Sequence, residues 1–262
     1  AGSDRASVGV PQGVVKDILT FTYNDLDSLR RAFTENPGAI AGVIMQPFET
    51  SKELPKPGFL EGVVRVAHDN GAVVIFDEIR SGFRVALGGA QEYYKVIPDL
   101  ACVSKAMANG YPISAVVGRR SVMEAAGKTR FSATFFVNAF PMIAAVETIR
   151  ELREKNAVAH MWRLGTRLME GLSVIGADLG VPLAMTGLPP IPMLRFTDPD
   201  AARREAVWRA FFAEMSRRGV LLHPGHCWFL SLAHTDADVD RTLEVARESL
   251  TVARAASPSA GG

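Results

Sequence analysis

The chain has 262 residues, which is enough for one large α/β domain or two smaller ones. Hydrophobic residues make up 48% and charged residues 22%, a balance that excludes intrinsic disorder as the main state because this much apolar surface can form a core. With 29 Lys and Arg against 28 Asp and Glu, the formal net charge of +1 favours neither nucleic acid nor an anionic membrane as a partner.

The first half of the chain alternates strands and helices. Asn24 or Asp25 caps an expected helix over 25–33, and Gly71 closes a second one over 58–70. Short apolar runs without polar alternation are typical of parallel strands covered on both faces. We expect such strands over 39–45, 72–76, 100–104 and 113–118. Strands separated by helices predict an α/β fold, a mostly parallel sheet with helices on both faces.

The pattern changes after about residue 151. Here we expect helices over 139–180 with a break near Asn156, over 201–217 and over 236–255, and short strands around Met185 and over 193–196, 220–222 and 228–232. This predicts a larger domain over residues 1–150 and a smaller C-terminal α+β domain over 151–262, whose residues 257–262 form a disordered tail.

Several features point to a cytoplasmic protein. Cys102 and Cys227 lie far apart and form no Cys-x-x-Cys pair, which argues against a structural zinc site and against a secreted disulfide framework. No apolar run is long enough to cross a bilayer, so we expect no membrane contact. The first residues contain no signal peptide and no initiator Met, so we expect the chain to begin inside a longer protein or after processing.

The strongest chemical signal is a pair of opposite charges at strand ends. Asp77 directly follows the apolar run 72–76, and Lys105 follows the run 100–104. In open parallel sheets ligands bind in the crevice at the carboxyl ends of the strands. Taken alone, each residue is more often a solvated loop charge. Found at two such ends, they predict a binding site.

The residues around this pair resemble a known enzyme family. The segments that carry the resemblance are 76–84, 88–94, 98–100, 104–113, 131–135 with Asn138, and 230–235 with 238–240. In this order and spacing they resemble the class III aminotransferases, most closely the glutamate-1-semialdehyde aminomutase branch, over residues 21–253.

The resemblance implies a fold, a cofactor and four site residues. The fold is that of the pyridoxal-phosphate-dependent transferases, which is aspartate aminotransferase-like, and the cofactor is pyridoxal 5′-phosphate. Lys105 matches the lysine that forms a Schiff base with the cofactor, and Asp77 the carboxylate beneath its pyridine nitrogen. Ile79 matches the residue packed on one face of the ring. Thr134 matches a residue that reaches the phosphate of the neighbouring subunit's cofactor, which implies a homodimer acting on a small-molecule amino donor and acceptor.

The chain also departs from the family pattern. Gln46 precedes Pro47 where relatives carry Glu, and Ala139 stands where they more often carry Pro. The N-terminal part of the family's large domain, with its phosphate-binding turn, is absent, and the nearest substitute, 88–90, is expected to be a loop. We therefore expect residues 1–262 alone to bind the cofactor weakly. The stretch 225–232 contains no arginine to hold a carboxylate, which favours the aminomutase-like branch.

Two functional hypotheses follow. The first is an aminotransferase or aminomutase that moves an amino group through Lys105. The second is an incomplete or non-catalytic homologue that serves as a fragment or an assembly partner. A metal site at His223, His226 and Cys227 is a weak third reading, because a single His-x-x-His has no second ligand cluster. We expect His68 and His160 to be solvated or to pack.

Overall fold

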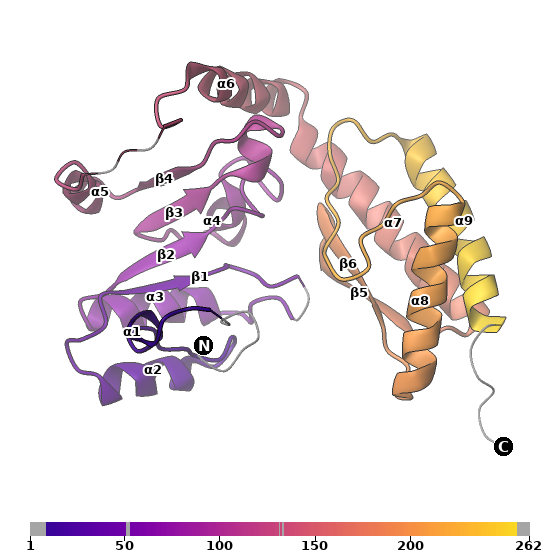
Figure 1. Cartoon of the computed structure of the whole chain (residues 1–262), viewed down its shortest axis with the longest axis horizontal. Coiled ribbons are helices and arrows are strands. Elements are labelled where there is room, and N and C mark those ends of the chain that lie inside the picture. Colours follow the sequence, from indigo (N-terminus) through magenta and orange to yellow (C-terminus); the bar gives the residue numbers. More distant parts are fainter. Residues whose placement is uncertain (1–8, 51–52, 131, 133, 256–262) are drawn as a thin grey trace.

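A four-stranded sheet forms the centre of the first part of the molecule. The computed structural model describes residues 9–50, 53–130, 132 and 134–255. The strands are β1 (Gly42–Met45), β2 (Val73–Asp77), β3 (Leu100–Val103) and β4 (Ala115–Gly118), and they lie in this order across the sheet (Figure 1). β1, β2 and β3 are parallel, and β4 is antiparallel to β3. The predicted α/β fold with a mostly parallel sheet is confirmed.

Helices beside the sheet begin where the sequence signals predict. α2 (Leu26–Glu35) follows Asp25, whose Oδ1 accepts hydrogen bonds of 3.0 Å from the backbone N–H groups of Asp27 and Ser28. α3 (Phe59–Asp69) packs on β2, within the buried cluster that fills this part. The remaining helices here are α1 (Gln12–Val15), α4 (Gly89–Tyr94), the 3-10 helix η2 (Lys105–Ala108) and α5 (Arg120–Ala126).

Two long helices lead into the second part. α6 (Ala139–Glu154) and α7 (Ala157–Leu179) are separated at Asn156, whose left-handed backbone (φ 48°) redirects the chain as the sequence predicts. The boundary predicted between residues 150 and 151 falls inside α6, and it stays a prediction. After α7 come an antiparallel hairpin, β5 (Leu183–Leu188) and β6 (Ile191–Phe196), and the helices α8 (Ala201–Arg217) and α9 (Asp236–Ala255).

The core of the second part lies between α7, α8, α9 and the hairpin. Its fully buried side chains include Leu164, Phe211 and Leu250, each of which contributes about 1.5–3 kcal/mol by burial. Gly165 has no room for a side chain, because a Cβ there would overlap the backbone oxygen of Pro189. The glycine lets α7 approach the turn of the hairpin directly.

The strands expected over 220–222 and 228–232 are not formed. The backbone N–H groups of Trp228 and Leu230 do donate to the carbonyls of Pro192 (2.8 Å) and Pro190 (3.1 Å). Proline has no backbone N–H, so neither partner can return a hydrogen bond, and no regular ladder develops. The segment instead forms an extended loop beside the hairpin.

Specific contacts join the two parts. Trp162 of α7 donates through Nε1 to the carbonyl of Val85 (2.9 Å), and Thr186 of β5 donates through Oγ1 to that of Thr50 (2.7 Å). Figure 1 shows the second part beside the carboxyl ends of β1, β2 and β3. Among the described helices, none has the length and apolar character that a membrane span requires.

Candidate functional site

The fold brings Asp77 and Lys105 to the same edge of the sheet. Asp77 is the last residue of β2, and its register partner on parallel β3 is Cys102. Lys105 follows only three residues after that partner, just beyond the end of β3. Both residues therefore leave neighbouring strands at the carboxyl edge, where ligands bind in such sheets.

The Asp77 carboxylate is half-buried and lacks a positive partner. Its Oδ1 accepts a hydrogen bond of 3.0 Å from the backbone N–H of Ile79. Within the described part of the chain, no Lys, Arg or His lies at ion-pair distance from it. Burial, and secondarily the Asp77 charge, raises the pKa of the Cys102 thiol on the neighbouring strand. The site thus carries an uncompensated negative charge.

Lys105 has an unusual backbone conformation for a lysine. Its φ of 44° lies in the left-handed region, which costs about 1–3 kcal/mol in a residue other than glycine. The turn is held by Ser104, whose Oγ donates to the carbonyl of Ile113 (2.7 Å), and by Met107 and Ala108, which pack with Ala145 of α6. The Lys105 side chain is exposed, and among the described residues no carboxylate pairs with it.

The other two predicted site residues lie in different places. Ile79 is half-buried two residues after Asp77, so it shares the same edge of the sheet. Thr134 is exposed in the turn before α6, and Figure 1 shows this turn on the side of the sheet away from the hairpin. Its motif neighbours Phe131 and Ala133 lie outside the described residues. Within one chain, therefore, three of the four residues lie at the carboxyl edge of the sheet, and Thr134 lies in the turn before α6.

Glu78 is a buried residue whose role the sequence did not indicate. Its carboxylate accepts hydrogen bonds from the backbone N–H groups of Ala90 (2.7 Å) and Gln91 (2.8 Å), and from the Ser81 hydroxyl. Gly89 has φ 79°, and a Cβ there would lie 2.5 Å from Glu78 Oε2. The loop expected over 88–90 is not formed, because Gly88 is the N-cap of α4 and the next two residues belong to its first turn. Its first amide groups bind Glu78, so they are not available to a phosphate.

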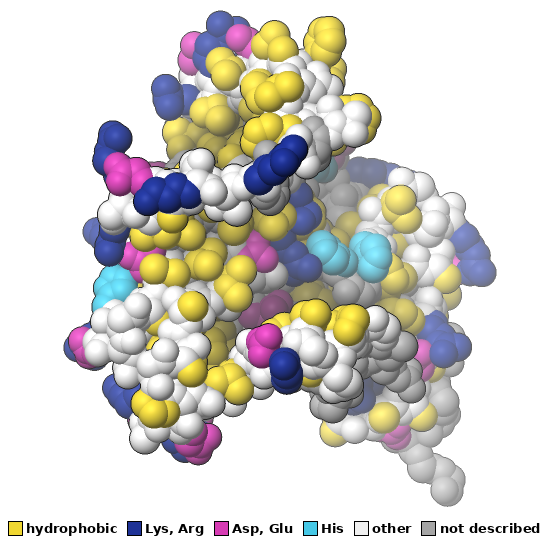
Figure 2. Space-filling view, turned by 60° about the vertical axis from the view of Figure 1, so that its left-hand side comes forward, with side chains coloured by type: hydrophobic (Ala, Val, Ile, Leu, Met, Phe, Trp, Pro, Cys, Tyr) yellow, Lys and Arg dark blue, Asp and Glu magenta, His cyan; other side chains and the backbone are white. Residues whose placement is uncertain are grey.

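A cleft of about 610 Å³ opens between η2, α6, α7 and the loop before α9. Its wall includes Ala106, next to Lys105, and also Arg84 and Phe229. The Arg84 guanidinium carbon lies 4.2 Å from the centre of the Phe229 ring, a cation–π contact. Sequence reasoning missed Arg84, although it lies inside one of the family-like segments. Figure 2 shows the molecule hollowed between its two parts.

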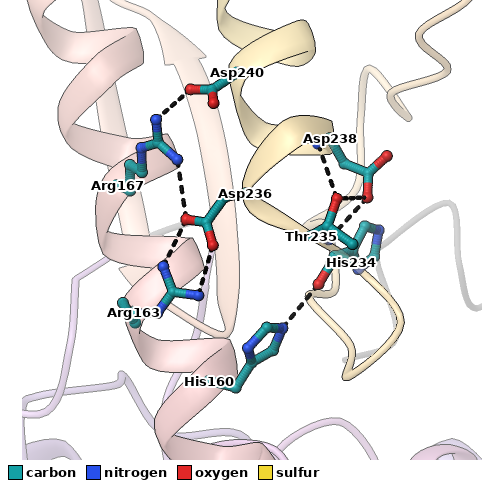
Figure 3. Close-up of polar contacts among 8 residues, drawn as sticks. All are labelled: His160, Arg163, Arg167, His234, Thr235, Asp236, Asp238 and Asp240. Atoms are coloured by element: carbon teal, nitrogen blue, oxygen red, sulfur yellow. Dashed lines mark hydrogen bonds and ion pairs between the residues drawn. The ribbon is translucent and has the colours of Figure 1, made fainter.

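The loop that lines this cleft is fixed to α7 by a network of polar contacts (Figure 3). At its end, Thr235 and Asp238 cap α9 reciprocally, since each backbone N–H donates to the other's side chain. His160 Nε2 lies 2.8 Å from the carbonyl oxygen of His234, so this side chain joins α7 to the loop. The ion pairs between the helices join Arg163 to Asp236, and Arg167 to Asp236 and Asp240.

The remaining histidines lie elsewhere in the fold. His68 Nε2 donates to Asp99 (2.8 Å), so this side chain packs against a buried carboxylate. His223 and His226 lie with ring centres 5.7 Å apart. In the described ranges no group of three or more His, Cys, Asp or Glu residues could hold a metal ion.

Comparison with known proteins identifies relatives of nearly the whole chain. The sequence profile of the aminotransferase class-III family matches residues 14–248. The chain is 37% identical over 247 residues to 3-aminobutyryl-CoA aminotransferase of Cloacimonas acidaminovorans (strain Evry), and 34% identical over 258 residues to glutamate-1-semialdehyde 2,1-aminomutase 2 of Brevibacillus brevis. These matches cover 92% and 93% of this chain, which spans about 60% of the length of each relative.

Solved structures agree with the sequence relatives. The FumI protein of Sphingopyxis sp. MTA144, in its PLP internal aldimine form, matches with a TM-score of 0.88 at 33% identity, over 93% of this chain and 59% of that one. An omega-transaminase from Sphaerobacter thermophilus matches with a TM-score of 0.85 at 26% identity, over 94% and 60%.

Proposed function

The chain belongs to the class-III aminotransferase family, and from this premise we propose that it transfers an amino group between small molecules with pyridoxal phosphate as cofactor. The observation that carries the proposal is that Asp77 and Lys105 both lie at the carboxyl edge of two neighbouring parallel strands. An acid and an amine in this arrangement are the two groups that this cofactor needs from a protein.

The residues present fit the cofactor by their charges. The half-buried Asp77 carboxylate lacks a cation among the described residues, and a protonated pyridine nitrogen would supply one. Lys105 is exposed on a constrained turn, and within the described residues no carboxylate holds its amino group. Ile79 offers an apolar surface beside Asp77 on which a ring can pack.

Each side chain then has a distinct chemical task. When bound, pyridoxal phosphate supplies an aldehyde that reacts with amines and a ring that accepts electrons. The Asp77 charge holds the proton on the ring nitrogen, which keeps the ring electron-poor. The Lys105 Nζ moves a proton to and from the substrate carbon that carries the amino group. Its fixed backbone limits where that nitrogen can reach. The same tasks would serve an aminotransferase, which moves the amino group between two molecules, and an aminomutase, which moves it within one molecule.

Thr134 enters the proposal through a second copy of the chain. It lies in an exposed turn, and the helix that follows exposes an apolar row, with Phe140 at 77%, Ile143 at 60% and Val146 at 64%. Figure 2 shows hydrophobic side chains gathered over α6. A patch of this kind marks an interaction surface. A two-fold interface along α6 would let each copy lend Thr134 to its partner's cofactor phosphate.

We propose a cytoplasmic location, since both cysteines are unpaired.

Variants of Lys105, Asp77 and Lys95 test the function. Lys105→Ala should abolish the visible absorption of the lysine-bound cofactor and the transfer of amino groups from small amines to pyruvate. Asp77→Asn should keep the shape of the site but lower turnover at least ~10²-fold, a loss of about 2.7 kcal/mol of transition-state stabilisation. Lys95→Ala is the control, because Lys95 is also exposed with a positive φ (58°) but precedes β3.

The outcomes separate the two hypotheses. Loss of absorption and transfer in Lys105→Ala, with both retained in Lys95→Ala, supports the enzyme. Absorption and transfer that depend on neither lysine contradict it, and favour the incomplete or non-catalytic homologue acting as an assembly partner.

A further inference from the structure

Arg84 is a positively charged side chain of the cleft without a negative partner. It is partly buried, and its guanidinium is placed by two contacts: the Phe229 ring at 4.2 Å and a hydrogen bond of 2.7 Å from Nη1 to the carbonyl of Arg80. Neither contact neutralises its charge. Among the described residues no carboxylate lies within ion-pair distance of it, although arginine forms most of the ion pairs found among those residues.

The acidic residues of the same cleft are already paired. Glu147 forms an ion pair with Arg150, and Glu151 pairs with Lys155 at 3.0 Å, in each case along α6 or at its end. The negative charges of Glu147 and Glu151 are therefore neutralised by cations of α6 or its C-cap. Arg84 is the charged side chain of the cleft wall that has no oppositely charged partner among the described residues.

The environment of Arg84 suits a planar anion. Burial lowers its pKa to about 10, with a small opposing effect of Cys227, so the desolvated guanidinium still carries its charge at neutral pH. One face of the guanidinium covers the Phe229 ring. The Arg84 nitrogens that have no hydrogen-bond partner are not buried. The donors not used by Arg80 are therefore open to the cleft. Guanidinium donors form a fork that matches the two oxygens of a carboxylate.

The cleft adjoins the proposed reaction centre. Ala106, directly after Lys105, forms part of its wall, together with Asn109 and Ser231. We infer that Arg84 binds the carboxylate of the amino or keto acid whose amino group Lys105 handles, which would make it a determinant of substrate specificity. The inference rests on the proposed function for the identity of the ligand. It also accounts for the lack of arginine in residues 225–232, because Arg84 comes from another segment and stacks on Phe229 of that stretch.

Binding of a simple carboxylate tests the site without any catalysis. The ¹⁵N-labelled chain is titrated with propionate and, separately, with the neutral isostere propionamide, and the arginine Nε–H signals are followed by NMR. The Arg84 signal, assigned by its loss in Arg84→Met, should shift saturably with propionate and not with propionamide. Arg84→Lys should bind propionate at least about tenfold more weakly, since it keeps the charge but loses the fork. Arg209→Met, at an exposed pair with Glu205, is the control and should bind normally.

Kinetics then identify the source of the carboxylate. In amino transfer from β-alanine, Arg84→Met should raise KM at least about tenfold and change kcat little, whereas KM for propylamine should not change. An Arg84 signal insensitive to propionate overturns the site. Arg84→Met could abolish propionate binding and yet leave KM for β-alanine unchanged. That result would show that Arg84 binds the carboxylate of a ligand other than the substrate, and it overturns the inference. Absence of all amino transfer at saturating pyridoxal phosphate contradicts the proposed function, while the titration still decides whether Arg84 holds a carboxylate.

Discussion

Replacing Glu78, which binds the first turn of α4, by glutamine should destabilise the chain more than a change at an exposed carboxylate of α4. The Glu78 side chain is fully buried and accepts from two backbone N–H groups of α4 and from the Ser81 hydroxyl. Glutamine keeps the volume but turns one acceptor oxygen into an NH₂ donor. This leaves at least one buried donor without a partner, at about 1–3 kcal/mol, and removes the charge from the remaining bonds, at about 1 kcal/mol.

The expected loss in free energy of unfolding is therefore about 2–4 kcal/mol. For a chain of this size a loss of about 3 kcal/mol lowers Tm by roughly 6–12 °C. Urea denaturation followed by circular dichroism measures the difference. Glu92→Gln is the matched control, since Glu92 caps Gly88 of the same helix at 2.6 Å but is exposed, and it should cost less than about 1 kcal/mol. Equal losses in the two variants would refute the reasoning.

Two further predictions concern pH and assembly. Burial raises the pKa of Asp99, but hydrogen bonds from Val74 and His68, with the nearby positive charges, outweigh it and hold that pKa below its ordinary value of 3.8. The ionised carboxylate therefore stabilises the fold above pH 3.8. The free energy of unfolding should exceed that of Asp99→Asn at neutral pH, and this difference should shrink as the pH falls below 3.8. A difference that grows in acid contradicts the prediction. Ile143→Glu, on the exposed row of α6, should convert a sedimenting dimer to monomer, and an unchanged sedimentation coefficient rules out that interface.

Local sequence signals predicted much of the fold. The all-apolar run before Asp77 forms a strand of the parallel part of the sheet, and the Asp25 cap and the break at Asn156 depend on neighbours within a few residues. The strand expected over 228–232 failed for a non-local reason. Its apolar pattern is suitable, but the segment beside it in space contains Pro190 and Pro192, which cannot complete a ladder.

The candidate site divides in the same way. Asp77 and Lys105 were predictable because each directly follows an apolar strand, and parallel neighbours end at the same edge. Arg84 was not, because its significance depends on Phe229, which reaches it only through the fold of the C-terminal half. The role of Glu78 was not predictable, because a carboxylate directly after Asp77 resembles a second surface charge, and only the fold places α4 against it.

The position of the reactive lysine is the most direct test of the account. Borohydride converts a carbon–nitrogen double bond between pyridoxal phosphate and a lysine into a stable single bond, and peptide mapping by mass spectrometry then locates the label. Limiting cofactor should label Lys105 in clear preference to Lys95, the exposed lysine that also has a left-handed backbone, and Asp77→Asn should reduce that preference. Labelling of Lys95 equal to that of Lys105, or a dominant label on any other lysine, would contradict the assignment of Lys105 and with it the proposed function.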